Sequence, residues 1–183
     1  MSYTEFNKIF GNGERVKDLP TDDLQVIREQ ISPSLADFFS QEGACRYDHG
    51  FLFTVNPMDY RDIVELIAGD DSKGWAIART CFGDLYLVMD DKVYLYQSSF
   101  NKFLEVAKDV ESFFSVFLVH TDFADKFLFR DIYPEAHERL GDAGYNECYG
   151  FVPAIPLGGP ESVNNLQMVT IKAYLSIIIQ AQQ

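Results

Sequence analysis

Hydrophobic positions recur along this chain at two spacings, and each spacing predicts a different kind of element. Leu24, Ile27 and Ile31 fall three or four positions apart, which is typical of the buried face of an amphipathic helix. Thr21 stands where a capping residue is favoured, so we expect it to cap that helix. The same criteria predict helices over about 4–9, 21–30, 34–42, 59–68, 122–130, 134–140 and 170–180. The segment 110–120 is apolar nearly all round, which predicts a buried helix.

Three β-rich runs follow one another in the middle of the chain, at 75–82, 85–89 and 92–96. The dipeptides Gly83-Asp84 and Asp90-Asp91 separate them, and Gly and Asp suit tight hairpin loops because they tolerate positive φ. We therefore predict an antiparallel three-stranded meander. The run 51–55, stopped by Asn56-Pro57, predicts a further strand that would extend the meander in a direction the sequence leaves open.

These elements together predict an α+β fold, with an antiparallel sheet (central meander at about 75–96) covered by helices and a helical C-terminal part. The chain has no internal repeat and no linker rich in Pro, Gly or Ser. We expect a mixed part at 1–104 and a mainly helical part at 105–183, packed as one compact unit. The segment 101–108 is a candidate junction, and 144–159 is rich in Gly and Pro, which favours a connection over a regular element.

The formal net charge of −13 and the pI of about 4.5 narrow the classes of partner. Such a charge repels phosphate backbones and anionic membrane surfaces, so we expect neither nucleic acid nor membrane as a direct partner. It favours a protein partner with a basic surface, whose association it would accelerate. The alternative is that the acidity serves solubility alone. The oligomeric state stays open.

The cysteines and the N-terminal residues indicate in which cellular compartment the protein is expected. The three cysteines, Cys45, Cys81 and Cys148, are far apart in sequence and odd in number, which argues against a secreted disulfide framework. The opening MSYTEFNKIF has no apolar stretch behind a basic start, so we expect no signal peptide. The longest apolar run is too short to cross a bilayer. We therefore expect a cytoplasmic protein.

The chain has three histidines, His49, His120 and His137, around which a catalytic or metal-binding motif could form. None lies in a GxSxG elbow, an HExxH pattern or beside a CxxC pair. The glycine pairs lack the lysine or the spacing of a phosphate-binding loop. We therefore expect no catalytic, cofactor or metal site. The competing hypothesis is an enzyme whose site forms only in the fold, where a histidine would meet a buried carboxylate.

Acidic and aromatic residues are the candidate partner-binding groups. The candidates are Asp70, Asp71, Asp90, Asp91, Tyr94, Tyr96, Asp131, Glu135 and Glu138. The last three acids recur at helical spacing and form either a solvated helix face or a docking strip for basic residues. The two tyrosines share one face of a strand, so they are either core or part of an exposed aromatic row that would anchor a protein partner.

Three strings resemble a known family. The strings GFLFTVNPMDY (50–60) and ARTCFGDLY (78–86) resemble the GAD-like domain of bacterial proteins, and ECYGFVPAIPLGG (147–159) resembles the C-terminal domain found with it. Together they are typical of immunity proteins that accompany DNase effectors of type VI secretion systems. The resemblance covers roughly 3–180, with one departure at Pro156, where the family favours a leucine-like residue.

The resemblance implies a cytoplasmic, non-enzymatic protein that binds and neutralises a cognate nuclease toxin. The alternative is an interaction or regulatory module of the same fold with no toxin. The shared motifs themselves are interpreted as scaffold, with glycines at turns, and Arg79 and Asp84 are expected to pair at one hairpin.

Overall fold

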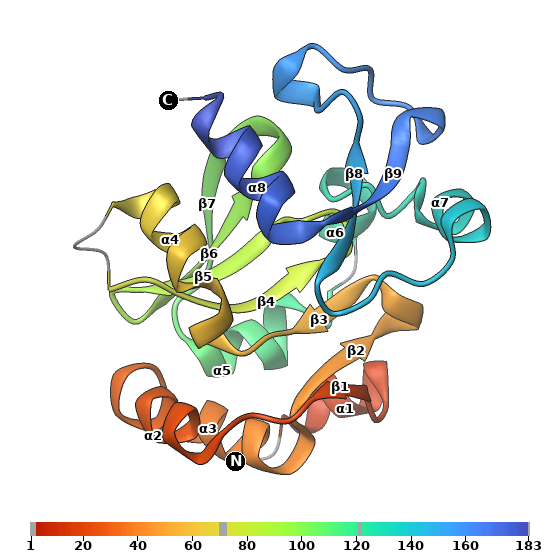
Figure 1. Cartoon of the computed structure of the whole chain (residues 1–183). Coiled ribbons are helices and arrows are strands. Elements are labelled where there is room, and N and C mark those ends of the chain that lie inside the picture. Colours follow the sequence, from red (N-terminus) through yellow and green to blue (C-terminus); the bar gives the residue numbers. More distant parts are fainter. Residues whose placement is uncertain (1–2, 70–72, 121, 183) are drawn as a thin grey trace.

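A seven-stranded antiparallel sheet forms the centre of the computed structural model (Figure 1), which describes residues 3–69, 73–120 and 122–182, with 124–126 described by their backbone only. The strands lie side by side in the order in which they occur in the sequence. They are β1 (Glu14–Lys17), β2 (Ala44–Tyr47), β3 (Leu52–Thr54), β4 (Trp75–Thr80), β5 (Leu85–Met89), β6 (Lys92–Gln97) and β7 (Lys102–Ala107). The predicted α+β fold and its central meander are confirmed, and β3 pairs antiparallel with β4.

The hairpin between β5 and β6 is as tight as its sequence predicts. Asp90 and Asp91 both have positive φ, 49° and 64°, and the pairs Met89–Lys92 and Val88–Val93 follow directly. Both central residues of a type I′ turn need positive φ, which Asp tolerates. The loop between β4 and β5 is longer than the predicted two residues, since β4 ends at Thr80 and β5 begins at Leu85. Thr80 N–H bonds Asp84 O across this loop, and Gly83 adopts a φ of 89°.

Helices cover both faces of the sheet. Figure 1 shows α4 and α8 above β4, β5 and β6, with α2, α3 and α5 below them. The helices are α1 (Thr4–Phe10), α2 (Thr21–Gln30), α3 (Pro33–Glu42), α4 (Arg61–Ala68), α5 (Val110–Ser112), α6 (Asp122–Phe127), α7 (Tyr133–Leu140) and α8 (Ile171–Gln180). None of the helices in the described part of the chain has the length and apolar character that a bilayer crossing requires.

Two helix predictions were wrong in detail. Thr21 does not cap α2: it is the first helical residue, behind Pro20, and no side chain caps that end. The segment 110–120 is not one buried helix, because α5 passes into a π-helical turn over Phe113–Phe117. This turn points Phe113 and Phe114 into the core and leaves Val116 56% exposed.

Aromatic rings fill the core on the α5 side of the sheet. Phe6 packs edge-on against Tyr47 (4.8 Å between ring centres) and against Phe114 (5.3 Å). Tyr86 packs 4.8 Å from Phe113, and burying a large ring in this way contributes much of a core's stability. Tyr86 is therefore part of the core.

A second sheet contradicts the prediction of an irregular connection over 144–159. β8 (Glu147–Phe151) pairs antiparallel with β9 (Leu166–Thr170). A Cβ at Gly150 would lie 2.7 Å from Val169 Cγ2, so glycine here permits close packing instead of a turn. Tyr149 N–H donates to Cys81 O at 2.8 Å, which joins the small sheet to the loop between β4 and β5.

Arg79 and Asp84 do not pair, contrary to expectation. Both are buried, but Arg79 donates to the carbonyl oxygens of Gly144 and Tyr145 at 3.1 and 3.0 Å. Asp84 accepts from Ser98 N–H at 3.1 Å and from the Thr80 hydroxyl at 3.2 Å. Apart from Thr80, which both side chains contact, the two charged groups bond different segments, and Arg79 ties β4 to the C-terminal part of the chain.

Candidate functional site

A polar cleft of about 510 Å³ opens between the N-terminal strands and α7. Its walls are charged or polar, with Ile9 and Phe10 from α1 on the rim. The main polar lining residues are Glu14, Arg46, Asp48, His49, His137 and Asp142. These residues come from segments more than 80 positions apart in the sequence, so only the fold assembles the cleft.

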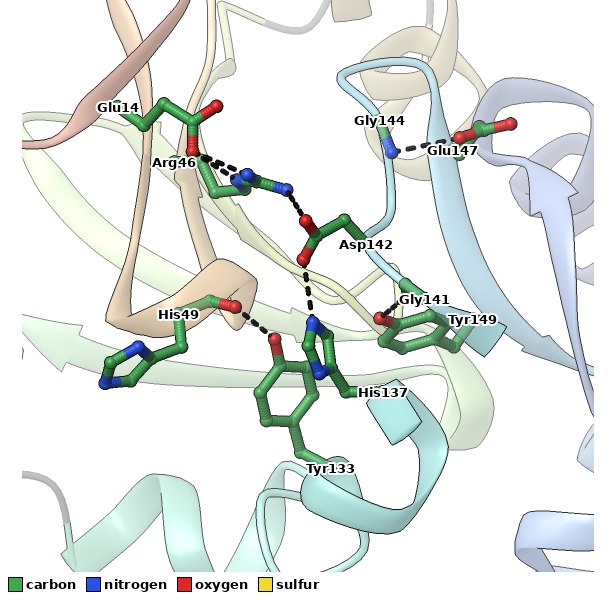
Figure 2. A network of polar contacts seen from close by, with 10 residues as sticks. All are labelled: Glu14, Arg46, His49, Tyr133, His137, Gly141, Asp142, Gly144, Glu147 and Tyr149. Atoms are coloured by element: carbon green, nitrogen blue, oxygen red, sulfur yellow. Dashed lines mark hydrogen bonds and ion pairs between the residues drawn. The ribbon is translucent and has the colours of Figure 1, made fainter. Parts of the chain in front are cut away.

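Four side chains form a continuous polar chain across the cleft (Figure 2). Arg46 Nη2 lies 2.5 Å from Glu14 Oε2, and Arg46 Nη1 lies 3.2 Å from Asp142 Oδ2. The other carboxylate oxygen of Asp142 is 2.7 Å from His137 Nε2. Arg46 thus bridges two carboxylates, one from each part of the chain, and its side chain is only 18% exposed.

The contacts of this chain shift the pKa values of two members. The hydrogen bond with His137 lowers the pKa of Asp142, and Arg46 lowers it further. The hydrogen bond with Glu14 raises the pKa of Arg46. An ionised carboxylate is therefore favoured at position 142.

The floor of the cleft is a strained turn. Asp48 and His49 have φ of 53° and 55°, in the left-handed region that non-glycine residues adopt rarely, although Asp and His are among those that tolerate it best. Two contacts hold the turn: the Tyr133 hydroxyl donates to His49 O, and Asp48 pairs with Arg130. Figure 2 shows Tyr133 and His137 side by side on α7, facing this turn. The strain is therefore supported from α7 and from the segment before it.

The charged side chains of the cleft are suited to binding charged groups. His137 and Asp142 are arranged as a histidine with an orienting carboxylate, but their side chains are 40% and 53% exposed. The described lining contains no Ser, Thr or Cys that such a histidine would activate. In the described residues, no three side chains of the metal-ligating types come together. The side chains of Glu14 and Asp142 are 64% and 53% exposed, so these carboxylates can also be reached from outside the cleft.

The predicted partner-binding acids are found in two separate places. Asp90 and Asp91 are exposed at the turn between β5 and β6. Asp131, Glu135 and Glu138 are exposed just before and on α7, which Figure 1 shows on the opposite side of the view from β5 and β6. Asp70 and Asp71 lie outside the described residues. The acids thus form two surfaces, and the one on α7 adjoins the cleft.

Of the two alternatives for the tyrosines of β6, core or exposed aromatic row, the exposed row does not form. Tyr96 is completely buried, because its ring packs 5.0 Å from Phe103 and its hydroxyl donates to Asn101 Oδ1. Tyr94, on the same face, is half-buried. The sequence could not reveal that β7 follows β6 and covers Tyr96.

The network of Arg46, His137 and Asp142 was not predicted from the sequence. The sequence presents His137 only as one of three histidines, and its partner Asp142 follows the glycine that ends α7. The partner Arg46 lies on β2, a strand that the hydrophobic pattern did not predict. Spacing along the chain gives no signal for such a contact.

Two family models match the chain, and together they span almost all of it. The GAD-like domain matches residues 1–100, and the C-terminal domain of the T6SS immunity protein Tdi1 matches residues 107–182. No protein of curated function matches significantly. The crystal structure of Atu4351 from Agrobacterium tumefaciens shares the fold, with a TM-score of 0.83 and 20% identity over 98% of this chain and 89% of that one.

Proposed function

We propose, from the premise that this chain belongs to the GAD-like domain family, that it is an immunity protein which binds and neutralises a cognate secreted toxin. The observation that carries this proposal is the match of residues 107–182 to the C-terminal domain of the T6SS immunity protein Tdi1. The toxin is further proposed to be a DNase. The place of action would then be the cytoplasm, because the DNA that a DNase attacks lies there.

Inhibition is proposed to occur by occlusion of the toxin's cationic surface. A DNase presents positive charge to the phosphate backbone, and this chain carries a net charge of −13. Opposite charges speed association and fix the orientation of the two proteins. The toxin partner is therefore expected to be basic.

Two acidic surfaces are proposed to guide that association. The first is the turn of Asp90 and Asp91, and the second is the α7 strip of Asp131, Glu135 and Glu138. The second adjoins the polar cleft, where the exposed carboxylates of Glu14 and Asp142 would accept a lysine or arginine of the toxin. Tyr94 remains a candidate anchor, whereas Tyr96 is buried and would serve as core.

Co-expression with the toxin encoded by the adjacent gene tests the proposal. A catalytically inactive toxin is used for co-purification, and the active toxin is used to score survival and DNA integrity. A stable complex together with rescue is the expected result. An unrelated protein of similar size and negative charge is the control, and rescue by that protein would show that charge alone suffices. No complex and no rescue would contradict the immunity function and favour an interaction module without a toxin.

A further inference from the structure

The two edge strands of the large sheet differ in length and in the share of charged residues. β1 has only four residues, three of them charged, and its pairing with β2 is interrupted by a bulge. Short length, charge and bulges all discourage a further strand from adding to an edge. The other edge strand, β7, has six residues, four of which are apolar (Phe103, Leu104, Val106 and Ala107). The pairing of β7 with β6 also has a register shift, at Val93 and Tyr94. β7 is nevertheless longer than β1 and has two charged residues against the three of β1.

Both faces of β7 expose an apolar side chain. Phe103 and Leu104 are consecutive, so they point to opposite faces, and each is 44% exposed. Phe103 is opposite Tyr96 and Leu104 is opposite Leu95 on β6, both of which are buried. An added strand would cover one apolar group on each face and continue the core outward.

An apolar groove of about 680 Å³ lies beside the end of β7. Leu104 and Ala107 face the same side of the sheet, because their partners Leu95 and Val93 do. The groove begins at Val106 and Ala107 and is closed by Val116, Phe117 and Phe123. A strand added to β7 could therefore place side chains into this groove.

The acidic residues around the groove favour a basic occupant. Asp90 and Asp91 lie at the turn that precedes β6, next to the end of β7, while Asp109 and Asp122 lie at the starts of α5 and α6. Two lysines lie at this end: Lys92 is paired with Glu105 at 2.8 Å, and Lys108, in the groove lining, is 3.8 Å from Asp109. Asp90, Asp91 and Asp122 leave an excess of negative charge here. A basic segment fits this end of the groove, whereas a second copy would bring another chain of charge −13 against it.

We propose that β7 is the docking edge for an extended segment of the cognate toxin, which adds to the sheet as an eighth strand. The segment would carry apolar residues at alternate positions and a lysine or arginine toward Asp90 and Asp91. Main-chain hydrogen bonds supply affinity in this mode of recognition, and the side-chain pockets supply specificity. The inference rests on the proposed function, because it takes the toxin as the partner.

Amide hydrogen exchange of the whole chain tests strand addition directly. It is measured with and without the catalytically inactive toxin encoded by the adjacent gene. Amides of residues 102–107 that do not bond β6 exchange quickly in the free protein, and we expect binding to slow them by about tenfold or more. A complex whose protection lies elsewhere would overturn this inference and leave the proposed function standing. Failure to form any complex would refute both.

Side-chain variants separate β7 from other exposed apolar sites. Leu104→Lys removes an apolar contact and adds a like charge facing a basic partner, so we expect the toxin to bind at least about tenfold more weakly. Ile177→Lys is the matched control on α8, where Ile177 is 58% exposed, and its affinity is expected to stay within about twofold. Equal effects of the two variants would overturn the proposal. So would protection of residues 102–107 that appears without toxin and rises with protein concentration, because a second copy would then occupy the edge.

Discussion

The guanidinium of Arg79 lies 3.8 Å from the centre of the Phe53 ring. The two residues are directly opposite on β4 and β3, and both are completely buried. A stacked guanidinium keeps its N–H groups free in the plane of the stack, and Arg79 uses them to bond Gly144 and Tyr145. One buried arginine thus connects the sheet of the GAD-like part with the C-terminal part.

Replacing this arginine with lysine is expected to destabilise the protein strongly. Arg79→Lys keeps the charge but loses the planar stack and one of the bonded nitrogens, which leaves buried carbonyl groups unpaired. We expect the free energy of unfolding to fall by about 3 kcal/mol, measured by urea denaturation. Arg28→Lys is the control, because Arg28 is 49% exposed in a surface ion pair, and its change should stay below about 0.5 kcal/mol. Similar losses in both variants would contradict the linking role of Arg79.

The buried carboxyl of Asp84 gives stability a pH dependence of unusual sign. Burial raises its pKa from 3.8 to about 6, although hydrogen bonds from Ser98 and Thr80 act against the shift. The folded state therefore binds a proton more tightly than the unfolded state, so Asp84 makes the protein less stable as pH rises from 3.8 to 6. The size of this loss is at most about 3 kcal/mol, from 1.36 kcal/mol per pKa unit.

Asp84→Asn removes this titration while retaining a side chain of similar shape. Unfolding of both proteins is followed in urea at several pH values between 3.5 and 7, values chosen to span roughly the two pKa values. We expect the stability of the wild type relative to the variant to fall across this interval and then to level off. A constant difference would show that Asp84 has an ordinary pKa.

The ion pair of Asp142 should show the opposite pH dependence and a small size. The pKa of Asp142 is lowered by His137 and Arg46, so its contribution is present above 3.8 and is lost as pH falls through the lowered pKa. The side chain is 53% exposed, and solvent screening limits such pairs to about 1 kcal/mol or less. Asp142→Asn should thus be slightly less stable than the wild type at pH near 7, with the difference vanishing in acid. A difference that grows in acid would contradict the network.

Removing acids from either proposed docking surface is expected to slow association with the toxin. Asp90→Asn/Asp91→Asn preserves the left-handed turn, because Asn tolerates positive φ, and Glu135→Gln/Glu138→Gln preserves the helix. At low ionic strength we expect the association rate to fall a few-fold and its salt dependence to weaken. Stopped-flow measurements provide both quantities.

Glu29→Gln/Glu161→Gln is the matched control, because it removes the same number of charges at exposed positions that belong to neither surface. If all three double variants slow association equally, total charge and not local placement guides the encounter. If none of them does, steering by these acids is refuted.

Neighbouring glycines in the loop after β8 should differ in their tolerance of alanine. A Cβ at Gly159 would lie 1.8 Å from the backbone oxygen of Pro153, whereas nothing lies within 4 Å of one at Gly158. Gly158→Ala meets only the strain of a φ of 85°, which costs about 1 kcal/mol. Gly159→Ala must displace backbone, so we expect a loss of more than about 2 kcal/mol in thermal or urea unfolding. A smaller loss for Gly159→Ala than for Gly158→Ala would contradict this close packing.

Local chemistry determined the elements that the sequence predicted well. The meander follows from β-rich runs separated by Asp90-Asp91, because both residues can adopt positive φ without outside help. The helices α2, α3 and α8 follow from apolar residues at helical spacing between breaking residues. In each case the signal lies within about ten residues, so it can be read before any tertiary contact exists.

Tertiary packing decided the rest, because the relevant contacts join distant segments. Strand β8 forms where Gly150 allows Val169 and Tyr174 to approach, although its sequence favours a turn. Tyr96 is core because β7 packs beside it. The same strand pairing leaves β7 as an open edge, a property that belongs to no residue alone.

By itself, the sequence determined the α+β class, the acidity and the family resemblance, since these depend on composition, periodicity and contiguous motifs. Only the tertiary structure decided that Arg46 bridges Glu14 to Asp142 and that Arg79 and Asp84 take separate partners. The physical reason is that a side-chain contact requires proximity of a few ångströms, and proximity between residues on different elements is fixed by how the helices and strands pack.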